Sequence, residues 1–103
     1  MSGAEKRQAK RVAFFCEAQL EGIDVSRANV RIADLSVDGA FVDAMTVLPP
    51  GTIAQLRFSV EARELALVAE VRYSMPGMGM GVRFLDVSEA DRSALEAIVA
   101  ERS

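Results

Sequence analysis

Two short stretches of the sequence carry side chains that suit the binding of an anion or a flat base. The first, EKRQAKR at residues 5–11, places Arg7 and Arg11 four positions apart, with Lys6 and Lys10 directly before them. A guanidinium is a planar fork that donates two parallel hydrogen bonds to a phosphate, and it also pairs with guanine or stacks on a base. Lysine supplies positive charge without that planar geometry. The stretch is therefore either a solvated basic tail or one half of a binding site.

The second stretch, DLSVDG at residues 34–39, offers a carboxylate, a hydroxyl and a glycine. Asp34 can accept hydrogen bonds from the N–H donors on the Watson–Crick edge of guanine, and Ser36 can donate or accept beside it. Gly39 permits a backbone conformation that a Cβ would penalise, or a close approach by a ligand. Asp34 and Ser36 share one parity, so we expect both to point to one side. Taken alone, the pattern equally fits a strand-ending turn in which these side chains bond their own backbone.

The rest of the chain must hold these two stretches in place. Most of it alternates between apolar and polar residues, as half-buried strands do. The predicted strands cover residues 12–20, 27–33, 40–42, 52–60, 63–73 and 80–84. The alternation assigns Ala28 and Tyr73 to the inward faces of their strands. Turn sequences such as LPPG and PGMG keep the connections short, which favours antiparallel pairing. Closing such a sheet into a barrel removes its exposed edges.

The period changes near the C-terminus, where residues 88–101 or so read as one amphipathic helix. Ser88 is a natural N-cap, and Asp91 three residues later completes a pattern like a capping box. Apolar residues then recur at helical spacing at Leu95, Ile98 and Val99. The predicted fold class is therefore all-β with one C-terminal α-helix that packs on the barrel.

Composition narrows the classes of function. The net charge of the 103 residues is −3, yet residues 1–11 hold four basic residues against Glu5 alone, so a basic arm precedes an acidic body. An acidic body disfavours DNA or RNA as a partner. The chain has no histidine, which removes the commonest general base and metal ligand. We therefore expect no enzyme, no cofactor and no metal site.

Cys16 is the only cysteine and lies among apolar residues in VAFFCEAQL, so we expect a structural thiol in a reducing compartment. The sequence shows neither a secretory signal nor an apolar run of about 18 residues. These features predict a cytoplasmic protein without membrane insertion.

Taken in order, the Arg-x-x-x-Arg of residues 7–11, the Asp-x-Ser-x-x-Gly of residues 34–39 and the segment GMGVRFLDVSEADR at residues 79–92 make the chain resemble the PilZ family. Members of that family are bacterial receptors for cyclic di-GMP, and the resemblance covers roughly residues 5–101. It implies a six-stranded antiparallel PilZ-type barrel with one C-terminal helix. It also divides the chain into a flexible basic arm, residues 1–11, and a barrel with its helix, residues 12–103.

The resemblance also assigns roles to the residues of both motifs. Arg7 and Arg11 would clamp phosphate and guanine, while Asp34, Ser36 and Gly39 would receive one guanine on the barrel surface.

Further ligand contacts are implied for three residues outside these motifs. Lys6 stands where some family members have an arginine associated with a stacked ligand dimer, which leaves the ligand stoichiometry open. Lys10 adds positive charge beside Arg11. Tyr73 ends a strand where an aromatic can flank the site in relatives, although its parity favours the core.

Two functions follow from the resemblance. The first is a receptor whose arm locks onto cyclic di-GMP and which then signals to a downstream protein in motility, exopolysaccharide or biofilm control. The alternative is a PilZ-like interaction module that binds protein without nucleotide. Relatives of that second kind typically lack the arginines and the Asp/Ser/Gly motif, which this chain has. An exposed apolar patch that includes Phe15 or Phe41 would favour the alternative.

Overall fold

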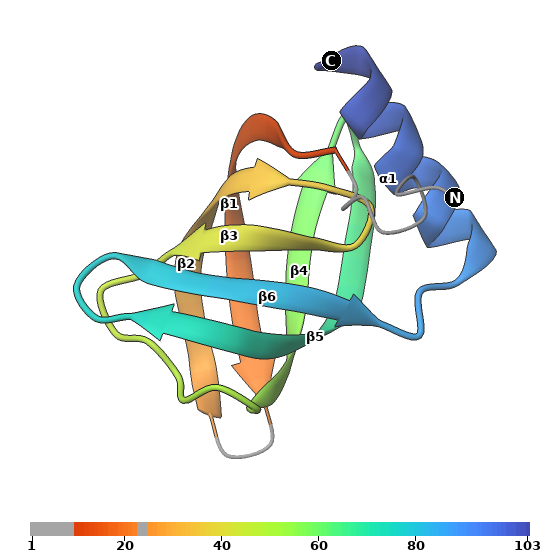
Figure 1. The fold of residues 1–103 in the computed structure, drawn as a ribbon. Coiled ribbons are helices and arrows are strands. Elements are labelled where there is room, and N and C mark those ends of the chain that lie inside the picture. The colour runs from red at the N-terminus through yellow and green to blue at the C-terminus, as the bar shows by residue number, and fades with distance from the viewer. Residues whose placement is uncertain (1–9, 23–24) are drawn as a thin grey trace, which may run out of the picture.

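The computed structural model describes residues 10–22 and 25–103. Its elements are β1 Val12–Gly22, β2 Val25–Leu35, β3 Gly39–Asp43, β4 Ile53–Val60, β5 Arg63–Met75, β6 Gly79–Leu85 and α1 Glu89–Glu101. The strands form a closed barrel in the order β1-β2-β3-β6-β5-β4, and every neighbouring pair is antiparallel (Figure 1). The predicted fold class is confirmed. Of the predicted arm, residues 1–9 with Lys6 and Arg7 lie outside the described residues.

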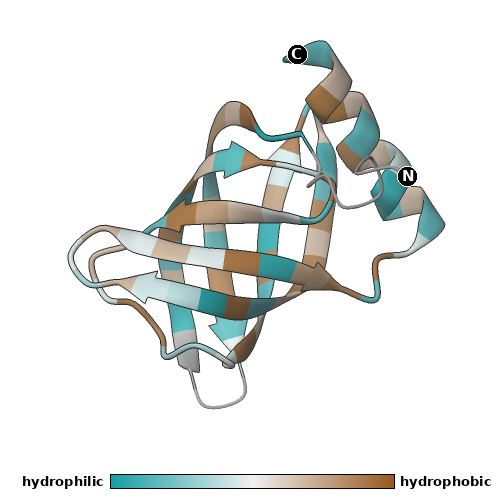
Figure 2. Ribbon diagram, in the orientation of Figure 1, coloured by the Kyte–Doolittle hydropathy of each residue, from teal (hydrophilic) through white to brown (hydrophobic). Residues whose placement is uncertain are grey.

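Apolar side chains fill the interior of the barrel. Apolar and polar positions alternate along much of the strands (Figure 2), and most of the apolar ones are buried. The largest side chains that are fully buried belong to Ile32, Leu35, Val42, Leu56, Leu65, Val71, Met80 and Leu95. Burying one aliphatic side chain of this size stabilises the fold by about 1.5–3 kcal/mol. Because the interior is packed, the outer wall is the place where this barrel can offer a ligand site.

The simple alternation overestimates burial at Ala28 and Cys16. Ala28 is exposed, so its predicted inward position is wrong. The reason is that β2 pairs with β3 only between Arg31 and Leu35, and at Ala28 the strand has no neighbour on that side. Cys16 is partly buried against the core, and this burial raises the pKa of its thiol. A partly buried thiol with a raised pKa fits the predicted structural role.

Register shifts turn side chains to the opposite face in two strands. One shift lies in β2 between Ile32 and Asp34, and another in β5 between Val71 and Tyr73. An extra residue on one strand reverses the facing of the residues that follow it. Val71 is therefore buried while Tyr73 is 47% exposed, so the predicted core position of Tyr73 is wrong. The shift in β2 likewise buries Leu35 and leaves Asp34 partly exposed on the outer wall.

The C-terminal helix α1 packs against the barrel beside one of its ends (Figure 1). Its N-cap is Ser88, whose Oγ accepts a hydrogen bond from the Asp91 backbone N–H at 3.1 Å, as the capping pattern predicted. Its buried side chains are Ala94, Leu95, Ile98 and Val99. Just after the helix, the Arg102 guanidinium lies 4.6 Å from the centroid of the Phe14 ring. Within the described part of the chain, no helix is long and apolar enough to cross a membrane.

Candidate ligand-binding site

Residues from the two motifs meet on the outer wall of the barrel. Arg11 directly precedes β1, and Ala13 in β1 pairs with Asp34 in β2. This pairing brings the Arg11 Nη1 donor within 2.6 Å of Asp34 Oδ1. The same oxygen accepts the backbone N–H of Phe41 in β3 at 3.2 Å. Asp34 is therefore tied to both neighbouring elements and holds the Arg11 side chain against the barrel.

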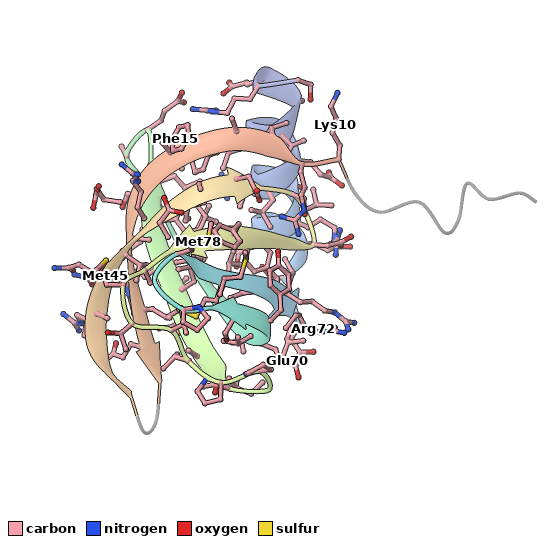
Figure 3. All side chains as sticks on the ribbon, turned by 60° about the vertical axis from the view of Figure 1, so that its left-hand side comes forward. Lys10, Phe15, Met45, Glu70, Arg72 and Met78 are labelled. Carbon is pink, nitrogen blue, oxygen red and sulfur yellow. The ribbon has the colours of Figure 1, made fainter. Side chains whose placement is uncertain are left out.

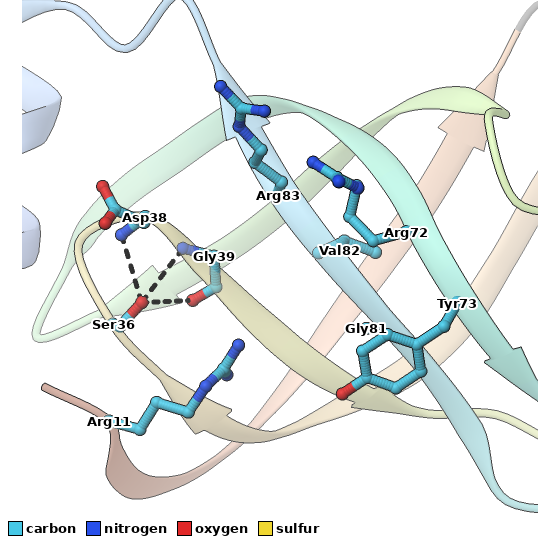
Figure 4. A pocket seen from close by; sticks show the side chains of 9 residues that line it. All are labelled: Arg11, Ser36, Asp38, Gly39, Arg72, Tyr73, Gly81, Val82 and Arg83. Atoms are coloured by element: carbon cyan, nitrogen blue, oxygen red, sulfur yellow. Dashed lines mark hydrogen bonds between the residues drawn. The ribbon is translucent and has the colours of Figure 1, made fainter. Parts of the chain in front are cut away.

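Ser36 organises the turn between β2 and β3. Its Oγ accepts the backbone N–H groups of Asp38 and Gly39, each at 3.1 Å, and its hydroxyl donates to the Gly39 carbonyl at 3.3 Å (Figure 4). The side chain is only 3% exposed. These bonds use the one donor and both acceptor positions of the hydroxyl. Ser36 thus forms the strand-ending turn that was the alternative interpretation of this stretch, and it shapes one border of the site.

Two glycines leave room for close contacts on this wall. A Cβ at Gly39 would lie 2.2 Å from the carbonyl oxygen of Val82, so glycine here lets β3 approach β6. A Cβ at Gly81 would lie 2.3 Å from the ring of Tyr73, which means that this ring covers the glycine. The Tyr73 ring also stacks on Phe41, with centroids 6.3 Å apart and planes 30° apart. The two glycines therefore let β3 pack closely on β6 and let the Tyr73 ring lie flat against β6.

A hollow of about 290 Å³ lies beside the Tyr73 ring, and we call it the arginine hollow (Figure 4). It is lined by Arg11, Ser36, Asp38, Gly39, Arg72, Tyr73, Gly81, Val82 and Arg83. Three guanidiniums in this lining face a single carboxylate, so the hollow favours anions. Among the residues predicted for the site, the structure brings Arg11, Ser36, Gly39 and Tyr73 together here, with Asp34 bonded to Arg11.

Arg72 and Arg83 are members of this site that the motifs do not contain. Arg83 lies between the buried residues Val82 and Phe84, so alternation alone predicts that its side chain points outward. Its place beside the Ser36 turn follows from the pairing of β6 with β3, in which Arg83 is the partner of Gly39. Strand order in the barrel therefore decides which outward side chains share the hollow.

The other predicted contacts fall partly outside the described residues. Lys10 is exposed beside Arg11, while Lys6 and Arg7 belong to the undescribed segment, so their roles stay predictions. Across residues 10–22 and 25–103, no group of three or more His, Cys, Asp or Glu side chains could hold a metal ion.

The fold and the hollow define a small β-barrel with a packed interior and an anion-attracting site on its outer wall. A family model described as the PilZ domain matches residues 5–101, and the chain belongs to this family. The resemblance stated from the two motifs is thereby confirmed. Among curated proteins, the comparison finds no match.

Several solved structures share the fold. The PilZ domain of CeSA from a cellulose-synthesizing bacterium is 20% identical, with a TM-score of 0.71 over 90% of this chain and 97% of that chain. The PilZ domain of Escherichia coli YcgR, solved with c-di-GMP, is 18% identical, with a TM-score of 0.76 over 94% and 91%. The Bacillus subtilis inhibitor of motility MotI/DgrA is 18% identical, with a TM-score of 0.78 over 94% of this chain and 50% of that chain.

Proposed function

We propose that this chain is a non-enzymatic receptor for cyclic di-GMP. The observation that carries the proposal is the ion pair between Arg11 and Asp34 beside the arginine hollow, because it joins residues from both motifs at one anion-attracting site. Membership of the PilZ family supports it, as does the c-di-GMP in the YcgR structure of the same fold.

The chemistry of the site matches the two faces of such a ligand. Arg11 offers its guanidinium to a phosphate or to the O6 and N7 edge of guanine. Asp34 engages Arg11 and Phe41 through Oδ1, and no described residue donates to its Oδ2. In this proposal Oδ2 accepts the N–H donors of the guanine Watson–Crick edge. Ser36 and Gly39 keep the turn in the shape that lets the base lie against the wall.

The arm of residues 1–11 is the second part of the proposal. Arg7 closes over the ligand from the arm, with Lys6 and Lys10 adding positive charge. Fixing a chain segment costs about 1–2 kcal/mol per residue, so several charge-assisted hydrogen bonds have to form together. Ligand binding then changes the outer surface, and a downstream protein in the cytoplasm recognises the changed surface. Motility, exopolysaccharide and biofilm control are the processes in which this output is expected.

The direct test is isothermal titration calorimetry of the purified chain with cyclic di-GMP, beside the Arg7→Ala/Arg11→Ala double variant. We expect the wild type to bind and the folded double variant to show no binding. The fitted stoichiometry separates one ligand per chain from a stacked pair. A folded wild type that shows no heat at high micromolar ligand contradicts the receptor proposal.

Replacing Asp34 by alanine is expected to weaken cyclic di-GMP binding by about tenfold or more, because one charged hydrogen-bond acceptor is lost. The barrel should stay folded, since the ion pair with Arg11 is surface-exposed and such pairs contribute about 0–1 kcal/mol. Asp43→Ala is a matched control. Asp43 in β3 also forms an ion pair with an arginine of a neighbouring strand, Arg31 in β2, at 3.2 Å, but it does not line the arginine hollow. Equal affinities of the two variants, measured by calorimetry, would argue against a ligand role for Asp34.

A protein-interaction module without nucleotide binding is the second candidate, and one observation favours it. Phe15, Met45 and Met78 are exposed by 69%, 85% and 58%, respectively (Figure 3). Phe41, in contrast, is partly covered by its stacking on Tyr73. Exposed apolar side chains of this size are typical of protein contacts. A partner that binds the Arg7→Ala/Arg11→Ala variant as tightly as the wild type, without nucleotide, would support this function.

A further inference from the structure

We propose that Arg72 and Arg83 form a second anion subsite in the arginine hollow, which takes the second phosphate of the cyclic dinucleotide. Neither residue belongs to the two sequence motifs. The inference rests on the proposed function, because it specifies how the same site selects a ligand with two phosphates.

The two arginines are placed together by the strand order. Arg83 in β6 pairs with Gly39 on one side and with Glu70 of β5 on the other. Arg72 lies at the register shift of β5. Its neighbours Val71 and Tyr73 pair with Val82 and Gly81 of β6, the two residues before Arg83. In Figure 4 both guanidiniums lie on one side of the hollow and Arg11 lies on the other. The hollow therefore has guanidiniums on two opposite borders, one of which is paired with Asp34.

The arginines of this subsite also differ from three other arginines of the barrel in their partners. Arg27, Arg31 and Arg57 each form an ion pair with a carboxylate on the barrel surface. Among the described residues, neither Arg72 nor Arg83 forms an ion pair. Asp38 is the one carboxylate in the lining. Two guanidiniums that border a hollow without carboxylate partners are suited to a ligand anion, and their planar forks fit phosphate.

The chemistry of the ligand explains why two borders are needed. A cyclic dinucleotide carries two phosphates on opposite sides of its ring, so a site that grips only one phosphate leaves the other in solvent. Arg11 holds the border next to Asp34. Arg72 and Arg83 then meet the phosphate on the far side, and the dinucleotide ring lies across the hollow between these two arginines and Arg11. A ligand with one phosphate gains nothing from the second border.

The test is calorimetry of the wild type and the Arg72→Ala/Arg83→Ala variant, titrated with cyclic di-GMP and with cyclic GMP, which has a single phosphate. We expect cyclic di-GMP to bind the double variant roughly 10- to 100-fold more weakly, because charged hydrogen bonds are lost. The much weaker affinity for cyclic GMP should be the same for both proteins. The Arg72→Lys/Arg83→Lys variant should recover only part of the loss, since lysine keeps the charge and lacks the fork.

Arg63→Ala is the control, because Arg63 is also exposed and forms no ion pair among the described residues, yet it borders a different hollow. Arg72 and Arg83 are exposed, so the unfolding curve of the Arg72→Ala/Arg83→Ala variant should match that of the wild type. Wild-type binding together with a double variant that binds like Arg63→Ala overturns the subsite and leaves the receptor function standing. A wild type that does not bind cyclic di-GMP overturns both.

Discussion

Replacing Arg11 by alanine is expected to lower the affinity for cyclic di-GMP by about 100-fold or more, which in calorimetry at micromolar concentrations amounts to loss of binding. The substitution removes a bidentate donor and also the partner that Asp34 holds at 2.6 Å. The side chain is 44% exposed, so the free energy of unfolding should change by less than about 1 kcal/mol. Binding and stability should therefore separate in this variant.

Two further variants make the Arg11 result specific. Arg31→Ala removes another exposed arginine that forms an ion pair between strands. The affinity of this variant for cyclic di-GMP should stay within about twofold of the wild type, because Arg31 does not line the arginine hollow. Arg7→Ala should cost no more than Arg11→Ala, since Arg11 abuts β1 and is anchored by Asp34. A stronger loss for Arg7→Ala would show that the arm, rather than the barrel edge, supplies the main grip.

Replacing Gly39 by alanine is expected to destabilise the fold by about 3 kcal/mol, at the upper end of the cost of overpacking. The added Cβ would lie 2.2 Å from the Val82 carbonyl oxygen, and a backbone atom of a central strand cannot move aside as a flexible side chain can. Relief requires that β3 and β6 separate, which moves the Ser36 turn away from Arg83. The variant should therefore lose both stability in denaturant unfolding and affinity in calorimetry.

Gly77→Ala is the comparison for this glycine effect. Gly77 has a φ of +81° and open space around its Cβ position, so the cost should be about 1 kcal/mol from backbone strain alone. The affinity for cyclic di-GMP should stay unchanged, because Gly77 lies in the turn between β5 and β6 and outside the arginine hollow. If Gly39→Ala unfolds at the same denaturant midpoint as the wild type, the strands accommodate the added Cβ without loss of stability, and the prediction is wrong.

The predicted facing was wrong at Tyr73 and Ala28, and in both cases the reason is how neighbouring strands pair. Tyr73 follows the inward parity of β5, yet it lies on the outer wall because a register shift precedes it. Such a shift depends on how two strands pair, and that pairing is not encoded in the alternation of one strand. Ala28 failed for a related reason, since its burial required a neighbouring strand that ends before it.

The sequence by itself determined the class of fold, the capped helix and the family. Period-two alternation, turn residues and the Ser88 cap are local properties, and local interactions along the chain are enough to produce them. The two motifs likewise named Arg11, Asp34, Ser36 and Gly39 without knowledge of their neighbours in space.

Only the tertiary structure decided how these residues form a site. The closure of the barrel places β6 between β3 and β5, and this order brings Arg72, Arg83 and Tyr73 to the hollow that Arg11 borders. Contacts between strands far apart in sequence depend on register and strand order, which are set by packing of the whole core. A single sequence shows which side chains point outward, whereas the closed barrel decides which of them meet.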